Sequence, residues 1–465
     1  MHNNWNFENS YLTLPKIFYS ITKPENFKDL KVILKNEHLL KFLDIKKEKF
    51  ENLIINSINN KNINYFSQAY AGHQFGNFTI LGDGRATFLG EHINKKNERC
   101  DIQLKGSGKT PYSRNGDGKG TLKSMLREYI VSEAMYNLNI NTTRSLAVLN
   151  TGEKITRNGF EEGGILVRVA KSHIRVGTFQ LAALSKERGN IEELAEYSIK
   201  RLHPEISEHK DRYLEFYKKI AENQIKSMVE WQRVGFIHGV MNTDNMALSG
   251  ETIDYGPCAF MDIYDPQTVF SSIDQMGRYA YFNQPSITKW NLARFAECLI
   301  PLIDENKDKA INIATEIINT FEKNYEMKWL NMMRDKIGLF GEEQKDQVLI
   351  LDLLTWMHKN KVDYTNTFCF LMNKKVKDDK IFYDESFQVW QKRWKERLML
   401  NNNTPKKYLK LMRSVNPLVI PRNHKVEEAL EAANNNDPTL VKKLIKILEN
   451  PYENQKEITN YQSSG

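Results

Sequence analysis

Alternating apolar and polar residues mark the first half of the chain, and apolar stripes with a helical period mark the second half. In CDIQLKG (100–106), Cys100, Ile102 and Leu104 fall on one face, and the intervening polar residues fall on the other. This alternation predicts a half-buried strand. Four more short strands complete a predicted five-stranded sheet, at 77–81, 85–91, 145–150 and 164–170.

The clearest predicted helix covers TLKSMLREYIVSEAMYNL (121–138). Thr121 is placed to cap it, and apolar residues recur along one face at helical spacing. Gly235 is a stop signal for a long helix at 211–234. The tail from Glu449 is polar and is expected to fray. The other predicted helices are 37–45, 49–58, 191–202, 290–304, 306–334, 344–358, 386–399 and 425–448.

Composition indicates a folded protein of ordinary type. The 465 residues are 40% hydrophobic and 27% charged, and the net charge of +8 comes from 66 basic and 58 acidic residues that are mostly interspersed. This charge favours a solvated surface first, anionic ligands second and nucleic acid a distant third. The chain also lacks coiled-coil heptads, so a monomer is expected.

The cysteines and the lengths of the apolar runs indicate in which cellular compartment the protein is expected. The four cysteines form no CxxC pair, which is typical of a reducing compartment. No apolar run approaches the roughly 20 residues that span a bilayer, and the first residues do not form a targeting segment. We therefore expect a cytoplasmic protein that does not enter a membrane.

The segment FIHGVMNTDNMALSGETIDYGP (236–257) carries the strongest chemical signal. In the kinase pattern H-G-D-x-x-x-x-N the Asp acts on the acceptor hydroxyl, and the Asn binds the metal. Asn245 occupies the Asn position, but Val240 stands where the catalytic Asp is expected. Asp244 precedes Asn245 directly, and Asp254 follows as a second candidate metal ligand. The pattern therefore keeps the metal-binding half of a kinase loop and lacks its usual base.

A glycine-rich turn precedes the predicted third strand. Gly82 and Gly84 flank Asp83, and such a turn is typical of a hairpin whose backbone N–H groups can approach phosphate. A plain hairpin is the competing interpretation. Lys105 ends the third strand, where kinases place the lysine that reaches nucleotide phosphates, although a solvated lysine is the alternative. KGSGKT is not a P-loop, because Gln103 stands where the first glycine is needed.

Charged residues farther along the chain extend this hypothesis. Glu128 is the first candidate partner for Lys105 on the predicted helix, with Glu133 in reserve, and a surface acid is the alternative for either. Arg168 and Arg175 lie seven residues apart and can converge on a polyphosphate, although two surface arginines are the simpler interpretation.

The loop PYSRNGDGKG (111–120) is the second glycine-rich segment. Asp117 and Gly118 within it are candidates for nucleotide contact, and a flexible connector is the alternative.

Long motifs resemble the selenoprotein O family, also called YdiU. The resemblance runs from NSYLTLP near the start to NPY near the end of the chain. The motifs are GDGRA (82–86), QLKGSGKTPYSRNGDG (103–118), LREYIVSEAM (126–135), RVAKSHIRVGTFQ (168–180), HGVMNTDNM (238–246) and IDYGPCAFMD (253–262).

The resemblance implies an α+β, protein-kinase-like fold with two lobes. The implied divisions are an N-terminal extension packed on the body (1–65), an N-lobe with an antiparallel sheet and one helix (66–180), a larger helical C-lobe with the metal loop (181–335), and a C-terminal helical extension with a polar tail (336–465).

The resemblance also implies a protein adenylyltransferase, which binds ATP inverted relative to kinases and transfers AMP to Ser, Thr or Tyr hydroxyls of proteins. The implied proton acceptor is Asp244, and the implied ligands of Mg²⁺, or alternatively Mn²⁺, are Asn245 and Asp254, with Asp254 also near ATP. Arg168 and Arg175 would hold the distal phosphates. The remaining implied nucleotide-site residues are Gly82, Gly84, Arg85, Lys105, Asp117, Gly118 and, through its pairing with Lys105, Glu128.

One departure from the family pattern concerns redox control. Family members often carry a cysteine or selenocysteine near the C-terminus, whereas this sequence ends in YQSSG and its last cysteine is Cys369. Redox control through the tail is therefore not expected here.

Two other functions compete with AMP transfer. A kinase would move the γ-phosphoryl group; Val240 argues against it, and Asp244 is the alternative base that a kinase would need. A catalytically inactive ATP-binding scaffold would bind nucleotide without transfer. The joint presence of Lys105, Asn245 and Asp254 argues against a scaffold, which has no need of all three.

Overall fold

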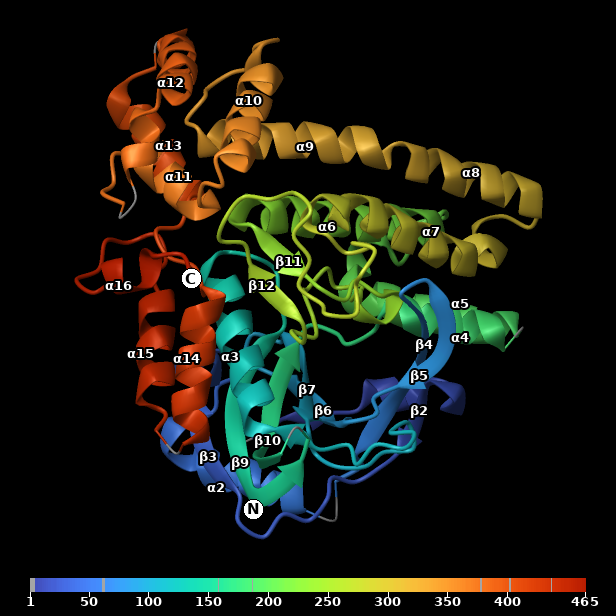
Figure 1. Ribbon diagram of the computed structural model, residues 1–465. Helices are drawn as coiled ribbons and strands as arrows, with labels where there is room; N and C mark the ends of the chain where they lie inside the picture. Colours follow the sequence, from blue (N-terminus) through green and yellow to red (C-terminus); the bar gives the residue numbers. More distant parts are fainter. Residues whose placement is uncertain are drawn as a thin grey trace.

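A computed structural model describes residues 5–465 except 61–62, 158, 186, 377–378, 401–402 and 436. The predicted extension (1–65) thus includes two short stretches, 1–4 and 61–62, that lie outside the described residues. The chain has the predicted α+β composition, with a twisted sheet in one part and packed helices in the other (Figure 1).

The predicted sheet of five strands has ten strands in the described part of the chain. All of its pairings are antiparallel. The main path runs β2 (Tyr19–Ile21), β4 (Phe66–Gln74), β6 (Ala86–Ile93), β7 (Arg99–Lys105), β10 (Phe160–Ala170), β9 (Arg144–Thr156) and β3 (Lys31–Lys35). Beside it lie β1 (Phe7–Glu8), β5 (Asn77–Gly82) and β8 (Gly120–Thr121).

The missed strands lack a clear alternating pattern. β4 is buried at its first seven positions, so both of its faces carry buried residues and no face is marked by exposed polar ones. β1 and β2 are two and three residues long, too short to show a period. The predicted extension therefore contributes strands to the sheet in addition to packing on it.

The glycine turn at 82–84 does not join a hairpin, contrary to the sequence prediction. β5 pairs with β4, from Ala69 opposite Gly82 to Gln74 opposite Asn77, while β6 pairs mainly with β7. The tight turn is instead Phe75-Gly76, where φ is +50° and +86°, as a two-residue hairpin loop requires. A phenylalanine at the first turn position is not a hairpin signal, which explains the wrong prediction.

The predicted alternation along β7 is confirmed. Cys100, Ile102 and Leu104 belong to an apolar core that also contains residues of α1 (Glu37–Phe42) and α2 (Phe50–Asn59). The opposite face carries buried polar residues, among them Gln103 and Lys105. The sheet thus has one apolar face and one face that holds charges.

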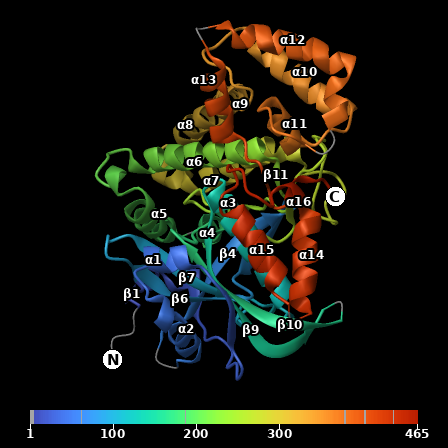
Figure 2. The ribbon, with the colours of Figure 1, turned by 90° about the vertical axis from the view of Figure 1, so that its left-hand side faces the viewer.

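The predicted helix at 121–138 is α3 (Leu122–Asn137), and the Thr121 side chain accepts a hydrogen bond from the backbone N–H of Ser124. α3 lies between strands β9 and β10 on one side and helices α14 (Asn423–Asn434) and α15 (Thr439–Leu448) on the other (Figures 1 and 2). Its Arg127 donates to Glu427 and Asn423 of α14 and to the Cys258 carbonyl oxygen, at 2.6, 2.9 and 2.8 Å. Chain segments about 300 residues apart are joined in this way.

The helical part follows the predicted order with two corrections and some additions. Two predicted long helices are each divided in two, 306–334 near Thr320 and 425–448 before Pro438, which cannot continue a helix. Four helices of the described residues were not predicted: α4 (Val176–Leu184), α11 (Tyr364–Leu371), α13 (Pro405–Val415) and α16 (Thr459–Gln462). α4 and α11 are buried at most of their positions and therefore show no stripe. α13 follows a polar stretch, and the four residues of α16 are too few to show a period.

The helices of this part are α4 (Val176–Leu184), α5 (Arg188–Leu202), α6 (Arg212–Val234), α7 (Gln284–Ile303), α8 (Lys307–Asn319), α9 (Phe321–Lys336), α10 (Asp346–Lys359), α11 (Tyr364–Leu371), α12 (Glu385–Leu398), α13 (Pro405–Val415) and α16 (Thr459–Gln462).

The polar tail is ordered against the body, although the sequence predicts fraying. Gln462 donates to the Leu418 carbonyl oxygen at 2.9 Å, and its own carbonyl oxygen accepts from Asn366 at 2.9 Å. Ile458 is buried in the main core. A few side-chain contacts thus hold a segment whose composition alone predicts mobility.

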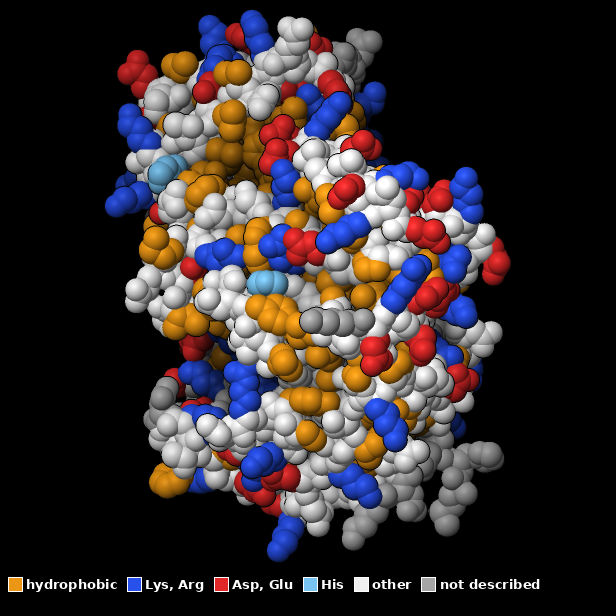
Figure 3. All heavy atoms as spheres, turned by 90° about the vertical axis from the view of Figure 1, so that its right-hand side faces the viewer, with side chains coloured by type: hydrophobic (Ala, Val, Ile, Leu, Met, Phe, Trp, Pro, Cys, Tyr) orange, Lys and Arg blue, Asp and Glu red, His pale blue; other side chains and the backbone are white. Residues whose placement is uncertain are grey.

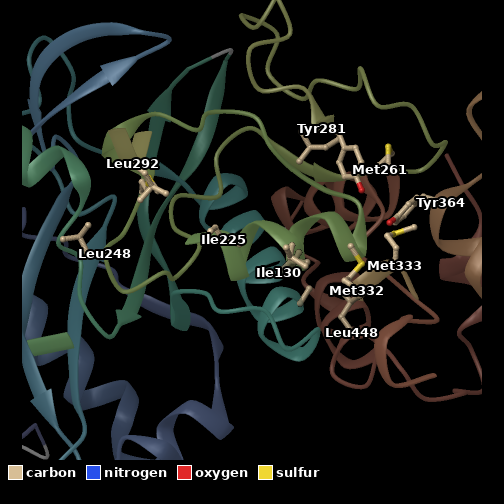
Figure 4. Packing of buried hydrophobic residues seen from close by; sticks show 14 of the residues in the cluster. Ile130, Ile225, Leu248, Met261, Tyr281, Leu292, Met332, Met333, Tyr364 and Leu448 are labelled. Atoms are coloured by element: carbon tan, nitrogen blue, oxygen red, sulfur yellow. The ribbon is translucent and has the colours of Figure 1, made fainter. Parts of the chain in front are cut away.

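One large hydrophobic core runs through both parts of the molecule. It includes Ile130 of α3, Ile225 of α6, Met332 of α9 and Leu448 of α15 (Figure 4). Gly235 ends α6 in the left-handed conformation with φ +73°, as predicted. Within the described ranges, no helix is both long and apolar enough to cross a bilayer.

Candidate active site

A cleft of about 810 Å³ opens between the charged face of the sheet and the loop that follows α6. Of the predicted site residues, all except Asp244 and Glu128 line it. The predicted residues in its wall are Gly82, Gly84, Arg85, Lys105, Asp117, Gly118, Arg168, Arg175, Asn245 and Asp254. Residues more than 150 positions apart in the sequence therefore surround one space.

Asp254 lies at the centre of the cleft wall. Its Oδ1 accepts from Lys105 Nζ at 2.7 Å and from Arg168 at 2.5 Å, and its Oδ2 accepts from Arg175 at 2.9 Å. Burial favours the neutral acid, but the three cations outweigh burial and hold the pKa of Asp254 well below its ordinary value. Asp254 is therefore a carboxylate at neutral pH.

The backbone at Asp254 is held in an unusual conformation. Its φ is +62°, in the left-handed region that residues other than glycine seldom occupy. The preceding Ile253 carbonyl oxygen lies 3.0 Å from His238 Nε2. His238 is thus a buried support for the Asp254 loop and does not line the cleft.

The predicted pair of Lys105 and Glu128 is present. Lys105 Nζ lies 2.5 Å from Glu128 Oε2, and Arg168 donates to Glu128 Oε1 at 2.6 Å. The reserve candidate, Glu133, points away from the cleft and binds Arg144 at 2.6 Å. α3 thereby connects to the cleft through one carboxylate that bridges two cations.

Arg175 connects the sheet side of the cleft with the loop side. Its guanidinium lies over the Tyr70 ring at 4.6 Å, 3.5 Å from Asp83, and it donates to the Asp244 carbonyl oxygen at 2.9 Å. Arg168 and Arg175 converge on Asp254, so the predicted spacing brings both guanidiniums to one place. Both side chains are only 2% exposed, whereas Asp254 is 21% exposed.

Asp244 lies immediately behind this wall. It belongs to a short turn, Thr243–Asn245, and its Oδ1 is buried without a hydrogen-bond partner among the described residues. Gly72 leaves room for it, since a Cβ there would come within 2.4 Å of Asp244 Oδ1. Burial raises the pKa of Asp244 to about 6. A carboxyl with this pKa can accept a proton near neutral pH.

Asn245 presents an amide oxygen to the cleft. Its Nδ2 donates to the Val240 carbonyl oxygen at 2.9 Å, which orients the amide. Val240 itself lines the cleft at the position where a kinase carries its base, and its side chain cannot take up a proton.

The glycine segment at 82–84 packs against the loop at 110–118. A Cβ at Gly82 would lie 2.3 Å from the Tyr112 ring, and one at Gly84 would lie 2.8 Å from the Tyr112 carbonyl oxygen. These glycines therefore permit close approach of two protein segments, and both segments line the cleft.

Asp117 is exposed at the rim of the cleft and is held by Arg157 at 2.7 and 3.0 Å. The hydrogen bonds from Arg157 are the main cause of the lowered pKa of Asp117. Arg157 itself lines the cleft and was not predicted, and neither were Tyr70 and Asp83. Arg157 follows a strand as a single basic residue, so no local pattern identifies it.

The donor groups of the cleft fit a divalent cation that arrives with phosphates. Within the part of the chain that the structure describes, no group of three or more His, Cys, Asp or Glu residues is arranged to hold a metal. Asn245 and Asp254 supply an amide oxygen and a carboxylate at the cleft. Mg²⁺ commonly takes one or two such protein ligands and completes its shell with phosphate and water.

Comparison with known proteins identifies the family of this chain. Residues 2–449 match the family model described as "Protein adenylyltransferase SelO". A protein of Pelagibacter ubique called "Protein nucleotidyltransferase YdiU" is 55% identical over 453 residues, which cover 96% of this chain and 94% of that protein. Proteins of the same name from Clostridium perfringens and Brevibacillus brevis are each 51% identical and cover 98% of this chain and 94% of their own length.

A family match over nearly the whole chain, together with relatives of this similarity, settles the family. The cleft of buried cations and the retained Asn245 and Asp254 lie within the matched residues. The chain therefore belongs to the SelO family and is a nucleotidyltransferase.

Proposed function

We propose that this protein transfers AMP from ATP to Ser, Thr or Tyr hydroxyls of other proteins and releases pyrophosphate. The observation that carries the proposal is the convergence of Lys105, Arg168 and Arg175 on Asp254 in one cleft. Three buried cations that meet at one partly exposed carboxylate provide donors for the phosphates of a triphosphate. We propose a kinase-like, two-lobe arrangement for this site, which the Lys105–Glu128 pair supports.

In this proposal ATP binds inverted relative to kinases. Arg168 and Arg175 lie in the inner wall, and their fork-shaped guanidiniums match the γ end, where the phosphate charge is greatest. With the γ end held there, the α-phosphorus is left for the acceptor. Gly82, Gly84, Arg85, Asp117 and Gly118 then lie along the rest of the nucleotide.

Asp244 accepts the proton in the proposed reaction. The acceptor oxygen forms a bond to the α-phosphorus, the bond from that phosphorus to the bridging oxygen breaks, and pyrophosphate leaves. The hydroxyl proton passes to the carboxylate of Asp244, whose Oδ1 has no hydrogen-bond partner among the described residues. A pKa of about 6 suits proton transfer late in the reaction, when the hydroxyl has become acidic.

A divalent cation completes the proposed site. Asn245 and Asp254 would hold Mg²⁺ or Mn²⁺ against the phosphates, where the ion neutralises charge that develops on the leaving pyrophosphate. Lys105, Arg168 and Arg175 would also stabilise the negative charge on the leaving pyrophosphate, through hydrogen bonds of their own. We further propose that a single chain acts in the cytoplasm, which its four free cysteines support.

The test is transfer of label from ATP to protein. The full chain and a set of candidate acceptor proteins are incubated with α-³²P-ATP and, in parallel, with γ-³²P-ATP. We expect acceptors to gain label from the α position only, and mass spectrometry to locate AMP on Ser, Thr or Tyr. Label from the γ position only would make the protein a kinase and overturn the mechanism. ATP binding without transfer of either label would favour a scaffold.

A further inference from the structure

A mixed apolar and basic surface lies beside Asp244, outside the nucleotide cleft. The β4–β5 hairpin, the segment 266–283 and the first half of α7 meet there. We call it the acceptor face, and it consists of Phe78, Ile80, Ile273, Met276, Arg278 and Trp290. Met276 is 93% exposed and Ile80 is 65% exposed. Figure 3 views the side on which the hairpin and α7 lie, and orange side chains are interspersed with blue and red ones at mid-height.

Contacts between rings hold the three segments together. The His73 and Trp290 ring centroids are 5.1 Å apart, and those of Phe75 and Tyr279 are 5.0 Å apart. At the tip of the hairpin, a Cβ on Gly76 would lie 3.7 Å from the Arg278 guanidinium carbon. The acceptor face is therefore one surface and not three independent loops.

Hydrogen bonds attach this face to the turn that carries Asp244. Tyr279 Oη donates to Asn242 Oδ1 at 2.6 Å, and the same oxygen accepts from the Phe75 backbone N–H at 3.0 Å. The backbone N–H of His73 donates to Thr243 Oγ1 at 2.7 Å. Because Asn242 and Thr243 immediately precede Asp244, a segment bound to this face is held close to the proposed proton acceptor.

Arg278 is the cation of this face that is available to a ligand. Its guanidinium carbon lies 4.9 Å from the centroid of the Trp290 ring and 5.7 Å from that of the Tyr279 ring, and among the described residues Arg278 forms no ion pair with a carboxylate. Asp274, the acid nearest in sequence, accepts from the backbone N–H groups of Arg278 and Tyr279 instead. Arg294 lies over the same ring at 5.0 Å, but it pairs with Glu297.

We propose that the acceptor face binds the protein that receives AMP, and that it selects a segment with an acidic side chain close to the target hydroxyl. Arg278 pairs with that carboxylate, and the exposed Ile80, Ile273 and Met276 cover an apolar neighbour of the acceptor residue. This inference rests on the proposed AMP transfer. It adds a specificity-determining residue that does not touch the nucleotide.

Peptide kinetics tests the proposal. Two fluorescent peptides carry the same Thr and one apolar neighbour, and they differ only in whether the flanking residues are Glu or Lys. With the full chain and α-³²P-ATP, we expect kcat/KM to be about tenfold higher for the Glu peptide, as a charge-assisted hydrogen bond allows. Arg278→Gln should remove this preference through KM, and Arg278→Lys should retain part of it.

Arg294→Gln is the matched control, because Arg294 stacks on the same ring but already has a partner. We expect it to keep the preference for the Glu peptide. An equal kcat/KM for the two peptides in the unmodified chain, or an unchanged preference in Arg278→Gln, would overturn the proposal.

Peptide binding, measured by fluorescence anisotropy, separates this proposal from the proposed function. If no α-label reaches any acceptor but Arg278→Gln still weakens binding of the Glu peptide, the AMP-transfer proposal fails and the docking site remains. If label is transferred and neither peptide is preferred in binding or in turnover, only the docking site fails.

Discussion

Each end of strand β7 belongs to a buried network of charged side chains. The two networks differ in whether solvent and ligand can reach them. At the start of β7, Asp101 pairs with Arg201 and accepts from the His173 backbone N–H at 2.8 Å. Arg201 also binds Glu91 at 2.9 Å, and the backbone N–H of Tyr11 covers the other oxygen of Glu91 at 2.8 Å. The N-terminal segment therefore closes this network.

At the other end of β7, Lys105 belongs to a network that opens into the cleft. Lys105, Arg168 and Arg175 share Asp254, which remains partly exposed, and Glu128 lies behind them. Burial and ion pairing are similar at the two ends. Access to the cleft separates the candidate site from the structural cluster, so neither burial nor a shifted pKa identifies a site by itself.

Exchanging one carboxylate in each network is the strongest test of this comparison. Asp254→Asn should lower AMP transfer by about 10²–10³-fold, because the cations and the bound metal lose their common partner. The free energy of unfolding should also fall, since Lys105, Arg168 and Arg175 are buried and lose a shared charge, so transfer is compared per folded molecule. The rate of label transfer and the urea unfolding curve measure the two effects.

Asp101→Asn is the matched change in the closed network. Removal of one charge there leaves Arg201 incompletely paired in a buried position, so the free energy of unfolding should fall by about 3–5 kcal/mol. Transfer per folded molecule should stay near that of the unmodified chain. Equal losses of transfer in both variants, at equal folded fraction, would contradict the distinction by access.

The dependence of AMP transfer on pH tests whether Asp244 is the proton acceptor. Its carboxyl must be ionised to accept a proton, so kcat/KM should rise about tenfold per pH unit below pH 6 and level off above it. Since burial raises this pKa in the folded state, the folded protein binds the proton more tightly than the unfolded chain does. The contribution of Asp244 to stability is therefore present below pH 4 and is lost as pH rises through about 6.

Glu251 provides a control for this profile, because burial raises its pKa to about 7 and it does not line the cleft. Glu251→Gln should keep the rise of kcat/KM below pH 6. A flat profile between pH 5 and pH 7 would argue against Asp244 as the proton acceptor.

The smallest effect is expected from reagents that modify thiols. Cys258 follows Pro257 of the cleft wall, and Cys100 lies beside the closed network. Both are buried, and burial raises the pKa of each thiol to about 12. Such thiols are poor nucleophiles, so iodoacetamide at neutral pH should leave transfer unchanged. Peptide mapping would show whether any cysteine is alkylated. Faster alkylation of Cys258 than of Cys100 would show that the cleft opens more deeply than the structure indicates.

The candidate site was predicted best where one short segment carries the whole signal. The motif around Asn245 and Asp254 and the position of Lys105 at a strand end are local, and the structure brings these residues to one cleft. Their chemical roles stay predictions. Arg157 was missed because its partner, Asp117, is 40 residues away, and the acceptor face was missed because its segments share no motif.

Local order could be read from the sequence because it depends on neighbours within a few residues. The alternation along β7, the Thr121 cap of α3 and the stop at Gly235 are all of this kind. The wrong predictions concern which strands pair and where helices end. They are the turn at 82–84, the number of strands and the two helices that are each divided in two. Short strands and buried helices carry no period for a pattern to show.

The sequence by itself determined the family, the α+β class and which residues could carry charge to a nucleotide. Only the tertiary structure decided which charged end of β7 is open, because closure depends on where Tyr11 and the N-terminal strands return to the sheet. It also placed α14 against α3 through Arg127 and Glu427. The physical reason is that periodicity follows from local geometry, whereas access and ion pairing depend on chain segments that meet only on folding.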